Sequence, residues 1–426
     1  MDYPEKLVIE PTTRCNFKCD MCVKQSPGCD ILEGDIDDAV FSMCGSLFPH
    51  LSSVIFTGIG EPLLHPNLET YLSGAENRMP EGSVRGFQTN GKLLTPQRAV
   101  SLLESGMNQI CISVDTVQPD LFDRVRQGGR LSDINQAFDA LDRAKKRIPN
   151  RPLQVGIECV LMKKNVSQLP LLVDWAAERK VDFIIFTHLT AYKKAVEDQI
   201  AYLNNSHDAY AMFESLKQEA DLKGLDITRY DKILWKVNKS EKEIDIYNQV
   251  AAFKDAALQK DLYVNLFHLL AEVPGEYDRL CRVFDRAEEK AKVHGIKIKL
   301  PGIRPLTDRR CPFMEEKVMF VSWQGDVSPC YFLWHQYTQM RAGYTKYIRP
   351  MVFGNIRQTT PEEIWQDTAY RLFREKVLKY DYPNCHAWCE IRCDYVLDDP
   401  FYQDCFINDI PCADCHWNLG LLNCLI

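Results

Sequence analysis

The sequence predicts an α/β fold with a parallel sheet, a helical insertion and a small Cys-rich α+β domain. Two observations predict this fold: strand-like and helix-like segments alternate through the first half of the chain, and cysteines concentrate near its end. Strands that alternate with helices indicate β/α units and a parallel sheet. The pattern does not separate a partial barrel from an open wound sheet. The six expected strands are residues 7–11, 53–58, 84–90, 109–115, 154–161 and 181–189.

The helical and Cys-rich segments follow from composition. Amphipathic stretches at 96–106, 132–147 and 167–180 separate the expected strands. We therefore expect three parts: a core over 1–190, a charged helical insertion over 191–305, and a Cys-rich domain over 306–426. That last part contains a hairpin that turns at Gln324-Gly325-Asp326, and a helix over 361–379 with Thr360 as its N-cap and Pro361 at its first position.

Charge and hydropathy exclude several classes of protein. The 426-residue chain has 51 Lys plus Arg against 59 Asp plus Glu, a net charge of −8, which argues against nucleic-acid binding through a basic field. The first residues contain no basic and apolar signal-peptide regions, and no apolar run approaches the ~18 residues of a membrane span. We expect a cytoplasmic protein with neither a nucleic-acid nor a membrane partner.

Cysteine placement gives the strongest functional signal. The chain has 17 cysteines, and clustered thiols in a protein without a secretion signal indicate metal ligands rather than disulfides. Cys15, Cys19 and Cys22 follow the first expected strand with the spacing C-x3-C-x2-C. A 4Fe–4S cluster normally takes four Cys, so three would leave one iron open for chemistry. A zinc site completed by a distant residue, or three unrelated thiols, are the alternatives.

Polar and glycine residues gather at the ends of the other expected strands. TGIGEP (57–62), QTNG (88–91) and SVD (113–115) each follow or end a strand, and IE and FTH occur in the fifth and sixth. The carboxyl ends of parallel strands meet at one edge of a sheet, where such folds bind ligands. A lone GIGEP is more often a turn, so the argument depends on the combination.

This combination resembles the radical S-adenosylmethionine (SAM) superfamily over about residues 7–190. The resemblance rests on the three cysteines, the G-x-G-E-P variant at 58–62, TNG at 89–91, Ser113–Asp115 and RVRQGGR at 124–130. It implies a partial (β/α)6 TIM-like barrel. It also implies a 4Fe–4S cluster that binds S-adenosylmethionine at its open iron and cleaves it reductively. The resulting 5′-deoxyadenosyl radical then abstracts hydrogen from a substrate.

The resemblance also implies a set of cofactor-binding residues. They are Gly58, Gly60, Glu61, Asn90, Ser113, Asp115 and Arg126. Glycines that expose carbonyls, together with Glu61, suit the methionyl ammonium, and the guanidinium of Arg126 suits the methionyl carboxylate. Asn90, Ser113 and Asp115 are suited to ribose or carboxylate oxygens. A solvated helix charge is the alternative for Arg126, and a cap or turn is the alternative for Ser113 and Asn90.

The tail resembles a SPASM extension, which holds one or two auxiliary 4Fe–4S clusters. Cys311, Gly325 and Cys330 fit its opening C-x13-G-x4-C, but the later spacing departs from the family pattern. Nine thiols fill two four-ligand clusters with one left over, and a single cluster plus a structural zinc is the alternative. The candidate ligands are Cys311, Cys330, Cys385, Cys389, Cys393, Cys405, Cys412, Cys415 and Cys424.

These resemblances imply a maturase that forms a crosslink or oxidises a side chain in a peptide, protein or metalloenzyme precursor. The ending DCFINDIPCADCHWNLGLLNC is similar to tails of maturases found with tungsten- and molybdopterin-dependent aldehyde oxidoreductases. Reduced flavodoxin or ferredoxin is the expected electron donor. The enzyme alternative is dehydrogenation or epimerisation of a small molecule such as an amino sugar. A non-catalytic iron–sulfur carrier explains the cysteines but not the residues at the strand ends.

Overall fold

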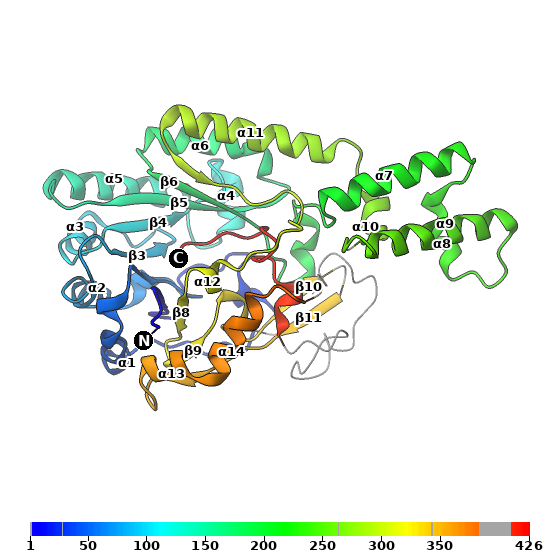
Figure 1. The fold of residues 1–426 in the computed structure, drawn as a ribbon. Helices are drawn as coiled ribbons and strands as arrows, with labels where there is room; N and C mark the ends of the chain where they lie inside the picture. Colours follow the sequence, from blue (N-terminus) through cyan, green and yellow to red (C-terminus); the bar gives the residue numbers. More distant parts are fainter. Residues whose placement is uncertain (1, 28, 263, 342–343, 383–409) are drawn as a thin grey trace.

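The computed structural model describes residues 2–27, 29–262, 264–341, 344–382 and 410–426, and its main feature is one ten-stranded sheet (Figure 1). The strand order is β12-β9-β8-β1-β2-β3-β4-β5-β6-β7, and every pair from β8 to β7 is parallel. The six expected strands are confirmed, with ends trimmed. They are β1 (Lys6–Ile9), β2 (Ser53–Phe56), β3 (Val84–Thr89), β4 (Gln109–Ser113), β5 (Gln154–Leu161) and β6 (Phe183–His188).

Helices follow the strands and cover the sheet, as the alternation predicts. Helix α5 is an example, because its residues Leu131, Ile134, Phe138 and Leu141 recur at helical spacing and are all buried. Among the described residues the two edge strands, β12 and β7, do not pair with each other, so the barrel is partial. The helices around it are α1 (Asp38–Met43), α2 (Leu68–Glu76), α3 (Pro96–Glu104), α4 (Pro119–Val125), α5 (Leu131–Arg147) and α6 (Leu169–Glu178).

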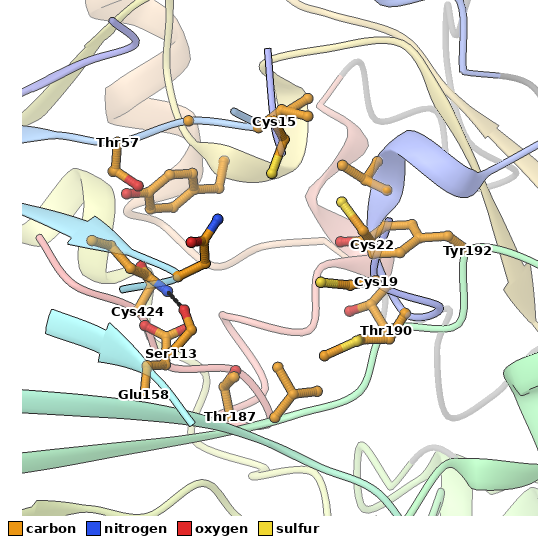
Figure 2. A pocket seen from close by; sticks show the side chains of 18 of the residues that line it. Cys15, Cys19, Cys22, Thr57, Ser113, Glu158, Thr187, Thr190, Tyr192 and Cys424 are labelled. Carbon is orange, nitrogen blue, oxygen red and sulfur yellow. Dashed lines mark hydrogen bonds between the residues drawn. The ribbon is translucent and has the colours of Figure 1, made fainter. Parts of the chain in front are cut away.

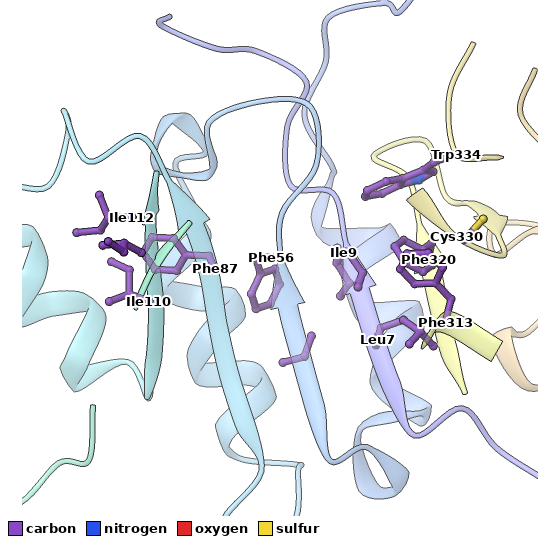
Figure 3. Close-up of a cluster of buried hydrophobic side chains, with 14 of the residues drawn as sticks. Leu7, Ile9, Phe56, Phe87, Ile110, Ile112, Phe313, Phe320, Cys330 and Trp334 are labelled. Atoms are coloured by element: carbon purple, nitrogen blue, oxygen red, sulfur yellow. The ribbon is translucent and has the colours of Figure 1, made fainter. Parts of the chain in front are cut away.

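A continuous hydrophobic core joins the barrel strands to the Cys-rich part (Figure 3). Ile9 of β1, Phe56 of β2 and Phe87 of β3 are fully buried, and Phe320 of β8 continues the same layer. Each buried Phe contributes roughly 1.5–3 kcal/mol relative to exposure. This layer makes the sheet a rigid support for the loops at its carboxyl edge.

The expected insertion divides into two structural parts. Helices α7 (His207–Leu222), α8 (Tyr230–Leu234), α9 (Glu241–Leu258) and α10 (Leu266–Ala271) share their own hydrophobic core and project from the barrel (Figure 1). Helix α11 (Glu276–His294) instead packs back on α6, and β7 (Lys297–Lys299) pairs with β6. The last part of the segment 191–305 therefore belongs to the barrel layer.

The C-terminal part is attached to the same sheet. Strands β8 (Val318–Val321) and β9 (Asp326–Ser328) form the expected hairpin, and β8 pairs in parallel with β1. The single helix expected over 361–379 is two helices, α13 (Pro361–Gln366) and α14 (Thr368–Val377), because the Asp367 side chain caps α14 by accepting from the Ala369 N–H at 2.8 Å. The remaining elements are α12 (Pro312–Glu315), β10 (Tyr337–Arg341), β11 (Tyr344–Ile348) and β12 (Gly354–Asn355).

The length and hydropathy of the helices decide whether any of them could cross a membrane. Within the described ranges, none combines the length and the apolar character that a membrane crossing needs.

Candidate active site

The loop after β1 presents Cys15, Cys19 and Cys22 on one wall of a cavity (Figure 2). A turn brings two of them together, because the Cys22 N–H donates to the Cys19 carbonyl at 3.0 Å. The segment after α4 supports the loop from outside. The Lys18 N–H donates to the Gln127 carbonyl at 2.8 Å, and the Asp20 N–H donates to the Val125 carbonyl at 3.2 Å. The conformation of the cysteine loop therefore depends on residues more than 100 positions away.

The two glycines of GIGEP permit close packing against this loop. A Cβ at Gly60 would lie 2.2 Å from the Thr12 carbonyl oxygen and 2.6 Å from that of Arg14. A Cβ at Gly58 would lie 2.5 Å from the Glu10 carboxylate. At Gly60 only glycine fits so close to backbone, so this glycine lets the end of the second strand pack against the cysteine loop.

Glu61 is a buried carboxylate on the cavity wall. Its Oε1 accepts from the Thr89 hydroxyl at 2.6 Å and the Leu63 N–H at 3.1 Å, and its Oε2 accepts from the Asn90 N–H at 2.7 Å. Burial raises the pKa of Glu61 above its usual value, while these donors lower it. A carboxylate offers about four acceptor positions, so one position on Oε2 stays available for an ammonium group.

Arg126 points into the cavity and is held by Asp115. The guanidinium Nε donates to Asp115 Oδ2 at 2.7 Å, and Nη2 donates to Oδ1 at 3.1 Å. Asp115 Oδ1 also accepts from the Val160 N–H at 2.9 Å. Asp115 therefore lies behind Arg126 rather than on the cavity wall, and it orients the arginine instead of facing a ligand directly. The solvated-charge alternative for Arg126 does not describe this geometry, since the guanidinium is mostly buried.

The cavity has a volume of about 340 Å³ and two chemically different ends (Figure 2). The three thiols form one end. The other is formed by Ser113 of β4, Glu158 of β5, Thr187 of β6 and Cys424. Six of the seven expected cofactor contacts line the cavity, and Asp115 is the seventh. The six are Gly58, Gly60, Glu61, Asn90, Ser113 and Arg126.

Burial sets the chemistry of the three loop thiols. It raises the pKa of Cys15 and Cys19, and it raises that of Cys22 to about 12, although Lys24 and Arg126 oppose the shift. A thiol with such a pKa stays neutral in neutral solution until a metal replaces its proton. The loop therefore fits metal ligation better than use as a free nucleophile.

Four C-terminal cysteines form a second group. The thiols of Cys311, Cys330, Cys412 and Cys415 are close enough that the charges of the others raise the pKa of Cys412, after burial itself. Backbone N–H groups of Phe313 and Met314 donate toward the Cys311 sulfur, a bond that stabilises a thiolate. The group is assembled from three segments of the chain. Cys385, Cys389, Cys393 and Cys405 lie outside the described residues.

The number of thiols in each group suits an iron–sulfur cluster. Nowhere in the described ranges do three His, Cys, Asp or Glu side chains converge on a point where one metal ion would sit. In a 4Fe–4S cube each thiolate binds a different iron, so such convergence is not required. Three thiols on one loop and four in the tail are the numbers of ligands expected for an open and a closed cubane, and the assignment of these residues to clusters stays a prediction.

Cys424 lies apart from the four-thiol group and lines the cavity. The last residues of the chain pack against the inner face of the sheet. The Asn423 N–H donates to the Thr187 hydroxyl at 3.1 Å, and Leu425 packs against Ile55 and Cys111 inside the barrel. The charge of Glu158 raises the pKa of Cys424, after burial. As a candidate cluster ligand, Cys424 stays a prediction.

Sequence reasoning counted Gln88 and Glu158 among the polar residues at strand ends without giving either a role, and it missed Tyr192 and Glu10. Glu158, Gln88 and Tyr192 line the cavity, and Glu10 supports it from behind. Glu158 had a visible signal, because a carboxylate inside an otherwise apolar strand is rare without a function. Glu10 ends the first expected strand, so a closer look at strand ends would have found it. Tyr192 carries no such signal.

Comparison with known proteins agrees with this geometry. The pattern of the Radical SAM superfamily matches residues 9–176, and that of the iron-sulfur cluster-binding domain SPASM matches residues 311–394. The chain therefore carries a radical SAM domain and a SPASM domain. Its cofactors are S-adenosylmethionine, a catalytic 4Fe–4S cluster and auxiliary iron–sulfur clusters.

Individual relatives narrow the comparison further. The chain is 27% identical over 426 residues to the tungsten-containing aldehyde ferredoxin oxidoreductase cofactor-modifying protein of Pyrococcus furiosus, with 99% of this chain and 97% of the relative covered. It is 27% identical to the Fe-coproporphyrin III synthase of Methanosarcina barkeri over 42% of each chain. Native anSMEcpe with bound AdoMet has a similar fold, with a TM-score of 0.51 and 15% identity over 90% of this chain and 88% of that chain.

Proposed function

We propose that this protein is a radical SAM maturase that modifies the cofactor, or a cofactor precursor, of a tungsten- or molybdopterin-type aldehyde oxidoreductase. The observation that carries the proposal is the end-to-end similarity to a cofactor-modifying protein, which covers 99% of this chain and 97% of the relative. The barrel, the projecting helices and the tail all fall within that similarity. A match to the barrel alone would support radical chemistry without a substrate class.

The residues of the cavity support separate roles in binding S-adenosylmethionine and in excluding water. When bound, the cluster and S-adenosylmethionine supply a 5′-deoxyadenosyl radical for hydrogen abstraction. Glu61 is placed to accept from the methionyl ammonium and Arg126 to donate to the carboxylate. Ser113 and Asn90 lie on the same wall for polar contacts. Tyr192 and Trp334 narrow the cavity and exclude water, which protects a radical from quenching.

The finer steps belong to the same proposal. The reaction would oxidise the substrate or form a crosslink, with an auxiliary cluster taking the electron that a substrate radical releases. Reduced ferredoxin or flavodoxin would supply the electron for S-adenosylmethionine cleavage. A peptide or protein substrate and an amino-sugar-like small molecule are the alternatives. The name of the Pyrococcus relative favours the cofactor over both, since it describes modification of a cofactor.

The test is reconstitution with the candidate substrate. The anaerobically purified protein is mixed with S-adenosylmethionine, a reductant and the pterin cofactor extracted from a tungsten oxidoreductase. We expect 5′-deoxyadenosine to form faster with the extract than without it, and the mass of the pterin product to change. The Cys15/Cys19/Cys22→Ala variant is the control and should do neither.

Two outcomes would count against the proposal. If only a peptide substrate accelerates 5′-deoxyadenosine formation, the maturase acts on protein and the cofactor assignment is wrong. If no 5′-deoxyadenosine forms under any condition in protein with full iron content, the radical activity itself is wrong.

A further inference from the structure

The end of the cavity opposite the three cysteines is a polar floor with aromatic side chains beside it. We call Gln88, Ser113, Glu158, Thr187 and Cys424 the cavity floor. The first four come from the neighbouring strands β3 to β6, and Cys424 comes from the C-terminal segment (Figure 2). Ser113 is an expected S-adenosylmethionine contact. The other four residues have no role in the proposed binding of S-adenosylmethionine.

Glu158 has an unused hydrogen-bonding atom at this floor. Its Oε2 is buried, and no side chain or backbone group of the described residues donates to it. Gln88 donates toward the same carboxyl group and also donates to the Ser113 hydroxyl at 3.3 Å. A buried acceptor without a donor is unfavourable, so a ligand that supplies a donor here gains affinity.

The electrostatic environment of Glu158 favours a ligand with N–H donors. Burial raises its pKa to about 7, and Asp115 adds to the effect, while Gln88, Arg126 and Lys299 oppose it. No cation forms an ion pair with Glu158 within the described part of the chain. A donor that faces Oε2 would hold the carboxylate in its ionised form, which accepts the strongest hydrogen bonds.

Aromatic side chains beside the floor favour a flat ligand. Tyr331, Trp334 and Trp417 all line the cavity, and the rings of Tyr331 and Trp417 are nearly parallel at 22°. Tyr331 and Trp334 are tilted at 56° to each other, so they form a corner. Aromatic walls around a few polar atoms are typical of sites that bind planar ring ligands.

We propose that Glu158 is the substrate-recognition residue of this cavity and binds an amino-substituted nitrogen heterocycle of the pterin class. Its carboxylate accepts from a ring N–H and from the adjacent exocyclic amine, with the ring packed against the aromatic side chains. This inference rests on the proposed function, since it identifies which part of a pterin cofactor the cavity holds. It goes further by assigning specificity to one residue of β5.

The experiment compares two probes that differ at the contact. Pterin (2-amino-4-oxopteridine) carries the amine, whereas 2,4-dioxopteridine has an oxygen in its place. Fluorescence titration of the iron-loaded wild type should show pterin binding at least about tenfold tighter than the dioxo compound. Glu158→Gln should lose most of that preference, because an amide oxygen accepts more weakly and the NH2 group repels the donors. Glu178→Gln, on the helical surface, should keep it.

Parallel measurements separate this inference from the proposed function. Iron content and circular dichroism of Glu158→Gln establish that the variant folds and loads its clusters. Its affinity for S-adenosylmethionine should stay within about twofold of wild type. A tenfold loss of that affinity would assign Glu158 to the S-adenosylmethionine ribose and overturn the inference. Equal binding of the two pteridines by the wild type would also overturn it. Pterin preference without any 5′-deoxyadenosine formation would support recognition and refute the radical function.

Discussion

The cysteine loop and the four-thiol group of the tail reach similar donor sets by opposite routes. Cys15, Cys19 and Cys22 lie within eight consecutive residues, and a single turn brings Cys19 and Cys22 together. Cys311, Cys330 and the pair Cys412 and Cys415 come from segments separated by up to 104 positions. The cysteine loop can therefore be recognised as a site from the sequence alone. The tail group forms only when three separate segments of the chain pack together.

The difference has consequences for stability. A local loop can take up metal with little change elsewhere, but its shape still depends on contacts with 125–127 and with Gly60. The tail group connects the hairpin of β8 and β9 to the end of the chain, so a bound cluster would close long loops and stabilise the fold. We expect mutations of the loop cysteines to abolish activity with little effect on folding stability. Mutations in the tail group should reduce activity and folding stability together.

The largest expected effect comes from the loop. The Cys15/Cys19/Cys22→Ala variant should form no detectable 5′-deoxyadenosine and should lose about four irons per chain. The tail group should keep its iron, because none of its contacts involves the loop thiols. Iron analysis and EPR on the anaerobic protein measure this. Loss of all iron would mean that the two groups do not load independently.

Removing the tail pair should have the next largest effect. Cys412→Ala/Cys415→Ala should lose about four irons and unfold at a lower temperature, while S-adenosylmethionine cleavage without substrate persists. Cys424→Ser is the matched control, because that thiol lies in the cavity rather than in the four-thiol group. Its iron content should equal that of wild type. If Cys424→Ser loses four irons, Cys424 is a cluster ligand and its separation from the four-thiol group is wrong.

Gly60→Ala tests how the barrel supports the loop. The added methyl would lie 2.2 Å from the Thr12 carbonyl oxygen, so the loop must move. Displacements of this size at a reacting centre cost about 100-fold in rate, and we expect a loss of about tenfold to 100-fold in 5′-deoxyadenosine formation. Gly74→Ala is the control, since its methyl would lie 3.1 Å from the Phe41 ring. Equal rates in the two variants would contradict this role of Gly60.

A smaller effect concerns His188, which lies under the tail segment. Its ring bonds to the Gly302 carbonyl at 2.9 Å, and burial lowers its pKa to about 3. The unfolded chain takes up this proton near pH 6.5, but the folded protein does not until about pH 3. Folding stability should therefore fall as pH drops below 6.5, by about 2 kcal/mol at pH 5.

Denaturant unfolding at pH 7 and pH 5 measures the pH effect. The variant His188→Gln keeps an N–H donor for Gly302 but cannot titrate, so its stability should change less between the two pH values. A variant with the same pH dependence as wild type would show that His188 is not the titrating group.

Most of the barrel was predictable because its periodicity is local. Each strand is a short apolar run, and helices such as α5 have their own apolar face. The helix over 361–379 was wrong as one element, because the capping side chain of Asp367 starts a new helix inside a continuous helical pattern. The sequence did not predict that the end of the segment 191–305 joins the barrel, since nothing local says that β7 pairs with β6.

The sequence by itself determined the chemistry of this protein. Cys15, Cys19 and Cys22 with G-x-G-E-P define the radical site, because ligand spacing and glycine requirements are properties of short segments. Only the tertiary structure decided that Asp115 orients Arg126, that four tail thiols group together, and that Glu158 and Cys424 share the cavity floor. Those relations join residues far apart in the chain, and packing of the whole core decides which of them meet.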